Sequence, residues 1–183
     1  FQRTQDRLGA VQRYVVPTEA FRRGDFSAAP TKVYDPATGD AILRDAVQRS
    51  GGAWIAGRAD DLGELVGSER LQMLASQANR VAPQLRTHDA FGHRIDEIEY
   101  HPAYHELMTL ALANGLHSTA WTAGRSGGFV ARAALNYLWN QGENGTSCPI
   151  TMTFAAVQVL RSTPALSKAW EPKLTADHYD PRL

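Results

Sequence analysis

The chain has 183 residues, 43% of them hydrophobic, which is enough for one ordinary hydrophobic core. Basic and acidic residues are equal at 19 each, so the composition argues against a dedicated nucleic-acid-binding module. No apolar run reaches the roughly 18 to 20 residues that span a bilayer, and the single cysteine, Cys148, cannot form an internal disulfide. We therefore expect a cytoplasmic protein without a membrane segment.

The first 38 residues are predicted to form an irregular arm. Helix-breaking residues interrupt every candidate helix there, at Pro17, Gly24, Pro30 and Pro36. Two runs, FRRGDFS at 21–27 and VYDPATG at 33–39, resemble a segment of large bacterial TonB-dependent outer-membrane receptors. Residues 1–38 are therefore either a foreign or fused segment or a turn-rich tail with a chance resemblance, and residues 39–183 form the predicted domain.

Helical spacing of apolar residues begins after the arm. It predicts three helices, over residues 40–50, about 60–66 and 68–81. The Gly51-Gly52 pair suits the end of the first helix, and Ser68 suits the N-cap of the third. The predicted buried faces contain Ile42, Leu43, Ala46 and Val47 in the first helix and Leu71, Leu74, Ala75 and Ala78 in the third.

Helical spacing lapses between residues 85 and 100. A turn at 89–92, with Gly92 suited to a positive φ, predicts a small hairpin or an extended excursion there. The next helix starts at His101-Pro102 and ends near Asn114-Gly115, because proline is tolerated in a first turn. Its predicted buried face contains Tyr104, Leu107, Met108 and Ala111.

Three further helices are predicted at about 126–143, 147–161 and 164–175. The apolar stripe of the first contains Phe129, Val130, Ala133, Ala134, Tyr137 and Leu138. The second is apolar nearly all round, so it is either central or covered by a partner. The third carries one seam, made of Leu166, Trp170 and Leu174. The fold class is therefore an all-α helical bundle with a small hairpin insertion and an irregular arm.

Three groups of side chains could carry chemistry. His101 and His105 have a spacing that suits a metal, but the His-Glu-x-x-His order is absent and a structural role at the helix end is favoured. Cys148 lies at a helix start, where its thiolate would be favoured, yet the apolar sequence after it indicates a buried, inert thiol. Thr151 and Thr153 either bond back to the helix backbone or position a ligand, and the backbone interpretation is favoured.

Three sequence blocks carry a family resemblance over residues 40–183. They are GHRIDEIEYHPAYHELM at 92–108, FVARAA at 129–134 and CPITMTFAA at 148–156. With the helix end WEPKL at 170–174, they are similar to the N-terminal region of AidB-type acyl-CoA dehydrogenases, flavoproteins of the adaptive response to alkylation.

The resemblance implies an acyl-CoA dehydrogenase-like N-terminal helical domain. In the family this domain is followed by a β-domain and a second helical domain, and the protein assembles as a homotetramer. FAD and a glutamate base carry out α,β-dehydrogenation of an acyl thioester. Because the β-domain and the base lie outside the matched region, we assign no catalytic, FAD-binding or metal-binding residue here and expect this fragment to be inactive. The corresponding helix lines the acyl cleft, which makes Cys148, Thr151, Met152 and Thr153 the substrate-cleft candidates.

Partners also follow from the resemblance. The expected partners are the rest of the protein's own chain, further copies of the protein in a homo-oligomer, an acyl-CoA-type substrate and, by family only, DNA. The alternative is a stand-alone helical interaction or oligomerisation domain that uses the apolar helix at 147–161 and the seam around Trp170 as its surface.

Overall fold

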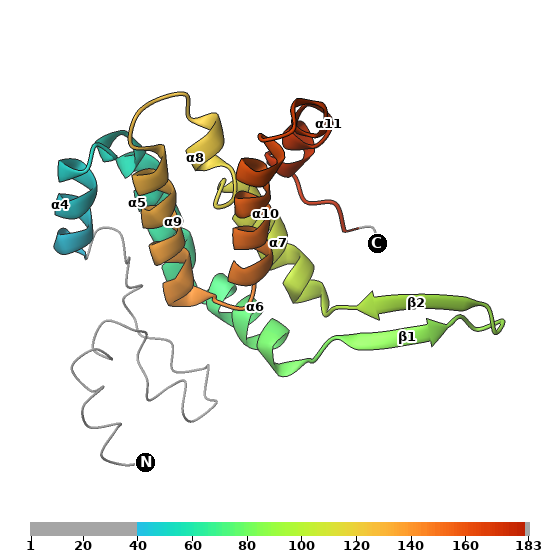
Figure 1. Ribbon diagram of the computed structural model, residues 1–183. Helices are drawn as coiled ribbons and strands as arrows, with labels where there is room; N and C mark the ends of the chain where they lie inside the picture. The colour runs from blue at the N-terminus through green and yellow to red at the C-terminus, as the bar shows by residue number, and fades with distance from the viewer. Residues whose placement is uncertain (1–39, 182–183) are drawn as a thin grey trace, which may run out of the picture.

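Residues 40–181 are described by a computed structural model, and the sequence assignments made for residues 1–38 lie outside them (Figure 1). The elements are, in order, α4 (Ala41–Arg49), η3 (Ala53–Ile55), α5 (Ala56–Gly67), α6 (Glu69–Arg80), β1 (Gln84–His88), β2 (Arg94–Glu99), α7 (Pro102–Ala113), α8 (Thr119–Thr122), α9 (Gly128–Gly142), α10 (Ser147–Leu160) and α11 (Pro164–Leu174). The predicted helical bundle with a hairpin insertion is confirmed.

Local capping chemistry sets the start of several helices. Asp40 Oδ1 accepts a hydrogen bond from the amide of Leu43 at 2.8 Å, and Ser68 Oγ accepts one from Leu71 at 3.2 Å. His101 Nδ1 accepts from the amide of Ala103 at 3.1 Å, directly before the proline that opens α7. The predicted N-cap at Ser68 is therefore confirmed.

Two helix predictions need correction. α5 covers Ala56–Gly67, whereas the sequence predicts a helix only over residues 60–66. Its first turns are mostly exposed and its buried side begins at Leu62, so no apolar pattern in the sequence marks the start of the helix. The short helix α8 was not predicted, since a single turn has no periodicity to detect.

The core lies where α5 packs on α9 and α6 packs on α7. Its fully buried large side chains include Leu62, Leu71, Leu107, Leu116, Leu135, Leu138 and Trp139. The predicted stripe of α9 is partly wrong: Phe129, Ala133 and Tyr137 are exposed, while Ala131, Leu135 and Trp139 are buried with the correctly placed Ala134 and Leu138. α9 is apolar on more than one side, so spacing alone does not select the side that packs.

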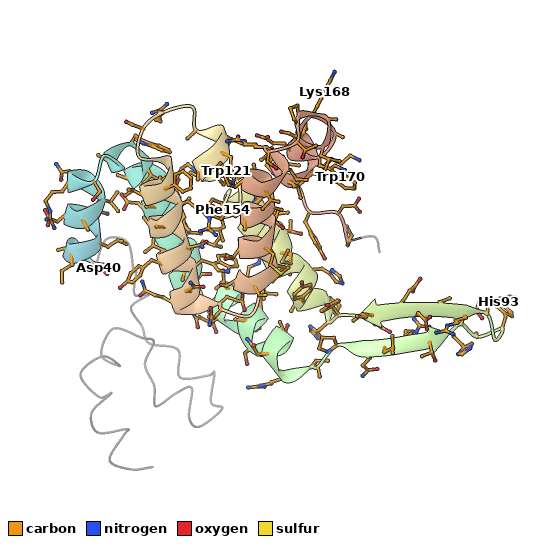
Figure 2. The ribbon with its side chains drawn as sticks, in the orientation of Figure 1. Asp40, His93, Trp121, Phe154, Lys168 and Trp170 are labelled. Atoms are coloured by element: carbon orange, nitrogen blue, oxygen red, sulfur yellow. The ribbon has the colours of Figure 1, made fainter. Side chains whose placement is uncertain are left out.

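The hairpin projects away from the helices, with His93 at its tip (Figure 2). Its strands are antiparallel, pair Leu85 with Ile98, and are exposed at nearly every position. Gly92 in the turn has φ +87°, as predicted. The register shifts between Arg86 and His88, where β2 has an extra residue and Asp96 adopts a left-handed φ of +48°, the geometry of a β-bulge.

Several apolar side chains of the outer helices face solvent. α4 and α11 contain no buried residue, and Ile42 of α4 is 83% exposed, contrary to prediction. α10 buries only Ile150 and Val157. The prediction that this helix is central in the bundle is therefore wrong, and the alternative, that a partner covers it, remains a prediction. Within residues 40–181, no helix combines the length and apolar character needed to cross a membrane.

Candidate functional site

α10 presents a continuous exposed face without a charged side chain. We call it the open face, and its residues are Cys148, Thr151, Met152, Ala155 and Val159. Their spacing of three and four places them on one side of the helix. Met152 is 68% exposed and Val159 70% exposed. The predicted burial of Cys148 is wrong, because the side of α10 that packs on the bundle is the opposite one, which carries Ile150 and Val157.

The structure brings three of the four predicted cleft residues together and separates the fourth. Cys148, Thr151 and Met152 share the open face, whereas Thr153 is half-buried on another side of α10. The Thr153 hydroxyl donates to the carbonyl oxygen of Pro149 at 2.9 Å. This bond is the backbone alternative foreseen for the threonines, so Thr153 has no hydroxyl hydrogen free to donate to a ligand.

An aromatic cluster of Trp121, Phe129 and Phe154 connects α8, α9 and α10. The Trp121 and Phe154 rings stack with centroids 5.0 Å apart, and Phe129 meets both rings edge-on. The indole nitrogen of Trp121 also donates to the carbonyl oxygen of Phe154 at 3.0 Å. The cluster therefore fixes the rotation of α10 and with it the direction of the open face.

A buried polar network fixes the start of α10. The carboxylate of Glu143 accepts from the backbone amide of Thr146 at 2.9 Å and from the Thr146 hydroxyl. That hydroxyl accepts in turn from the indole nitrogen of Trp139 at 3.1 Å. Glu143, Thr146 and Trp139 are all at most 3% exposed, so the turn between α9 and α10 is held by groups that satisfy one another.

Three histidines make contacts that stabilise the fold. His101 caps α7, and His105 Nδ1 lies 2.9 Å from the hydroxyl of Tyr179. His117 is 1% exposed, and its Nε2 donates to the carbonyl oxygen of Ala176 at 2.9 Å. Residues 40–181 contain no cluster of three or more His, Cys, Asp or Glu side chains suited to a metal ion.

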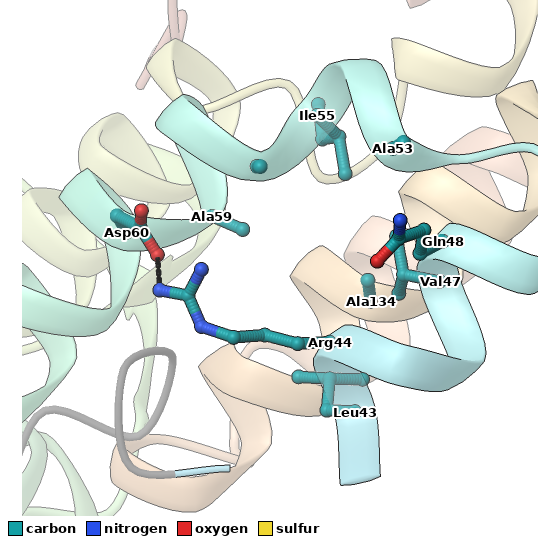
Figure 3. A pocket seen from close by; sticks show the side chains of 10 residues that line it. Leu43, Arg44, Val47, Gln48, Ala53, Ile55, Ala59, Asp60 and Ala134 are labelled. Atoms are coloured by element: carbon teal, nitrogen blue, oxygen red, sulfur yellow. Dashed lines mark hydrogen bonds and ion pairs between the residues drawn. The ribbon is translucent and has the colours of Figure 1, made fainter. Parts of the chain in front are cut away.

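A cavity of about 260 Å³ lies elsewhere, between α4, η3, α5 and Ala134 of α9 (Figure 3). Its lining is largely apolar, with an ion pair between Arg44 and Asp60 at one side. None of the predicted site residues lines it. The cavity is therefore separate from the open face.

Arg132 is a site residue that the sequence alone did not reveal. It reaches the open face from α9, where its Nη2 donates to Thr151 Oγ1 across 3.4 Å, and its guanidinium lies over the ring of Phe154. The signal available in the sequence was a lone arginine inside the apolar run FVARAAL, which resembles an ordinary solvent-facing position.

The helical bundle with its projecting hairpin is the architecture expected of an acyl-CoA dehydrogenase-type N-terminal helical domain. Residues 27–181 match the family described as adaptive response protein AidB N-terminal domain, and the chain belongs to that family. The match begins at residue 27 and thus includes part of the predicted arm.

Two relatives agree with this assignment. The chain is 41% identical over 146 residues to putative acyl-CoA dehydrogenase AidB of Escherichia coli K12, covering 79% of this chain and 27% of the relative. It is 28% identical over 148 residues to acyl-CoA dehydrogenase family member 11 of Caenorhabditis elegans, covering 77% and 24%. The chain thus spans about a quarter of these relatives.

The solved structures share the fold. One is C. elegans ACDH-11 in complex with C11-CoA, with a TM-score of 0.69, 22% identity, and 80% of this chain and 26% of that chain covered. The other is the apo-form of Bd2924, with a TM-score of 0.70, 23% identity, and 79% and 30% covered.

Proposed function

We propose that this chain is the N-terminal part of an AidB-like flavoprotein that performs FAD-dependent α,β-dehydrogenation of an acyl thioester. In this proposal the open face of α10 is one wall of the acyl-binding cleft, with Cys148, Thr151 and Met152 as lining residues. The observation that carries the proposal is an exposed, uncharged helix face, held at a fixed rotation, in a chain whose relatives are named acyl-CoA dehydrogenases. A solved relative that contains C11-CoA supports an acyl-CoA ligand.

The residues of this chain fit one wall of such a site but not the whole of it. The open face carries no carboxylate to act as the base and no array of donors for the pyrophosphate of FAD. FAD, when bound by the complete protein, supplies the hydride acceptor. The role left for the open face is to exclude water and to orient the acyl chain, so we expect the fragment alone to be inactive.

The biological setting belongs to the same proposal. We assign the complete protein to the cytoplasm, as a homo-oligomer that takes part in the adaptive response to alkylation. DNA binding has no support in the equal numbers of acidic and basic residues.

A second candidate function is a stand-alone interaction domain. It is favoured by exposed apolar side chains that continue from α10 to α11, where Leu166 is 46% and Trp170 49% exposed. Light scattering and hydrophobic-dye binding on the purified chain test the interaction domain. A monomer that binds no dye would eliminate the interaction domain.

The dehydrogenase proposal is tested with a chimera in which this chain precedes the remainder of the E. coli relative. We expect bound flavin that an acyl thioester reduces, with a KM for long acyl chains raised about tenfold or more by Met152→Trp. Ile42→Trp, on the exposed side of α4, is the matched control and should leave KM unchanged. A flavin-loaded chimera that no acyl thioester reduces would contradict the dehydrogenase proposal, and equal KM values for the two variants would contradict the cleft wall.

A further inference from the structure

Arg132 is held in a fixed orientation beside the open face. Its Cζ lies 3.7 Å from the centroid of the Phe154 ring, and its Nη2 contacts Thr151 Oγ1 at 3.4 Å. A guanidinium stacked on an aromatic ring keeps its plane fixed and its remaining N–H groups directed along that plane. The charge therefore has a defined position at the edge of the open face.

The charge of Arg132 is not compensated within residues 40–181. No carboxylate of this part of the chain forms an ion pair with it, and its Nε is buried without a hydrogen-bond partner. Burial lowers the pKa of Arg132. An unpaired, partly desolvated cation destabilises a fold unless something else requires it, and an arriving anion would remove that cost.

Arg161 stacks on the same aromatic cluster, but its charge is paired with a carboxylate. Its guanidinium lies over Trp121 at 4.9 Å, as Arg132 lies over Phe154. Unlike Arg132, it forms a forked pair with the carboxylate of Glu171, with Nε 3.1 Å from Oε1 and 3.2 Å from Oε2. The bond to Arg161 lowers the pKa of Glu171, so this pair stays ionised. Of these two arginines on the aromatic cluster, Arg132 is therefore the one without a carboxylate partner within residues 40–181.

We propose that Arg132 and Thr151 form an oxyanion-binding subsite at the edge of the open face. The planar fork of arginine matches a carboxylate or a phosphate, and the threonine hydroxyl supplies a further donor. The identity of the molecule that carries the anion rests on the proposed function: it is either a carboxylate on the acyl chain or a phosphate of the thioester carrier. The subsite itself rests only on the contacts of Arg132.

The subsite is tested on this chain by NMR titration. The probes are inorganic phosphate and acetate, added at constant ionic strength, and the signals are the arginine side-chain N–H groups and the Thr151 amide. We expect the Arg132 and Thr151 signals to shift saturably while those of Arg161 stay unchanged. Arg132→Gln should abolish the Thr151 response, Arg132→Lys should weaken it, and Arg161→Gln should leave it intact. Equal responses of the two arginines, or an equal effect of chloride, would overturn the subsite.

The source of the anion is tested in the flavin-loaded chimera. Two acyl thioesters of equal chain length are compared, one ending in a methyl group and one in a carboxylate. If Arg132→Gln raises KM for the carboxylate-ended thioester alone, the acyl chain carries the anion; if it raises both KM values equally, the carrier phosphate does. Unchanged KM values for both would overturn a role in substrate binding. If no acyl thioester reduces the flavin, the proposed function fails, and the titration of the chain still decides whether the subsite exists.

Discussion

Gly127, at the start of α9, packs directly against the backbone of Gly51 in the loop after α4. A Cβ atom at position 127 would lie 2.1 Å from the carbonyl oxygen of Gly51, and Gly127 has a left-handed φ of +78°. Both features require glycine at position 127. The contact joins loops that are far apart in the sequence and holds the loop after α4 against the start of α9.

Gly127→Ala should therefore destabilise the fold strongly. Overpacking against backbone atoms costs about 1–3 kcal/mol, and the left-handed conformation adds about 1–2 kcal/mol. Gly124→Ala is the matched control, because Gly124 also has a left-handed φ, of +63°, but nothing lies within 4 Å of the place that an alanine methyl group would take there. Urea unfolding measures both variants, and equal losses would show that the loops do not touch.

Thr146→Val should destabilise the turn between α9 and α10. Valine keeps the shape of threonine but leaves the indole nitrogen of Trp139 and the buried carboxylate of Glu143 without a shared partner. We expect the free energy of unfolding to fall by about 1–3 kcal/mol. Thr109→Val is the control, since its exposed hydroxyl only donates to the backbone of His105 and its loss should change stability by about 0.5 kcal/mol or less. Chemical unfolding followed by near-ultraviolet circular dichroism reports the difference, and a cost no larger than that of the control would contradict a stabilising network.

Local chemistry explains which parts of the fold could be predicted from the sequence. The cap at Ser68, the proline start of α7 and the positive φ of Gly92 each depend on a few neighbouring residues, and all were predicted. The buried and exposed faces of the helices were harder to predict. α9 and α10 are apolar on several sides, so the exposure of Phe129 and Cys148 depends on which elements pack against them and not on spacing.

The site was predictable only in part for the same reason. Its location on α10 came from family resemblance, whereas the separation of Thr153 from Thr151 followed from helix rotation. Arg132 could not be selected, because the missing counter-ion that makes it unusual is a property of its surroundings in space. A lone arginine in a sequence carries no such information.

Tyr179→Phe should loosen the segment that follows α11. The hydroxyl of Tyr179 shares a hydrogen bond of 2.9 Å with His105 Nδ1 on α7, and its loss should cost about 0.5–1.5 kcal/mol. Backbone amides of residues 176–180 should then exchange faster with deuterium. Tyr100→Phe is the matched control, because Tyr100 stacks on Tyr104 at 4.3 Å and that ring contact survives removal of the hydroxyl. Identical exchange in the two variants would show that the hydroxyl of Tyr179 does not anchor the segment.

His117 should make the stability of the domain depend on pH. Burial, with a smaller contribution from the charge of Arg132, lowers the pKa of His117, although its bond to Ala176 acts in the opposite direction. Below the ordinary value of about 6.5, the unfolded chain takes up a proton that the folded chain excludes, so stability falls as pH falls and is unaffected well above that value.

The matched variant is His117→Gln, which keeps an N–H donor for the carbonyl oxygen of Ala176 but does not titrate. Between about pH 7.5 and 5.5, the native chain should lose up to about 1.4 kcal/mol more unfolding free energy than the variant. The other histidines are common to both proteins, so their contributions cancel in this difference. Equal losses in urea titrations at the two pH values would mean that His117 is protonated in the fold as readily as in the unfolded chain. A charged imidazolium would then lie buried next to Arg132. This arrangement is unfavourable, because His117 Nδ1 has no hydrogen-bond partner within residues 40–181.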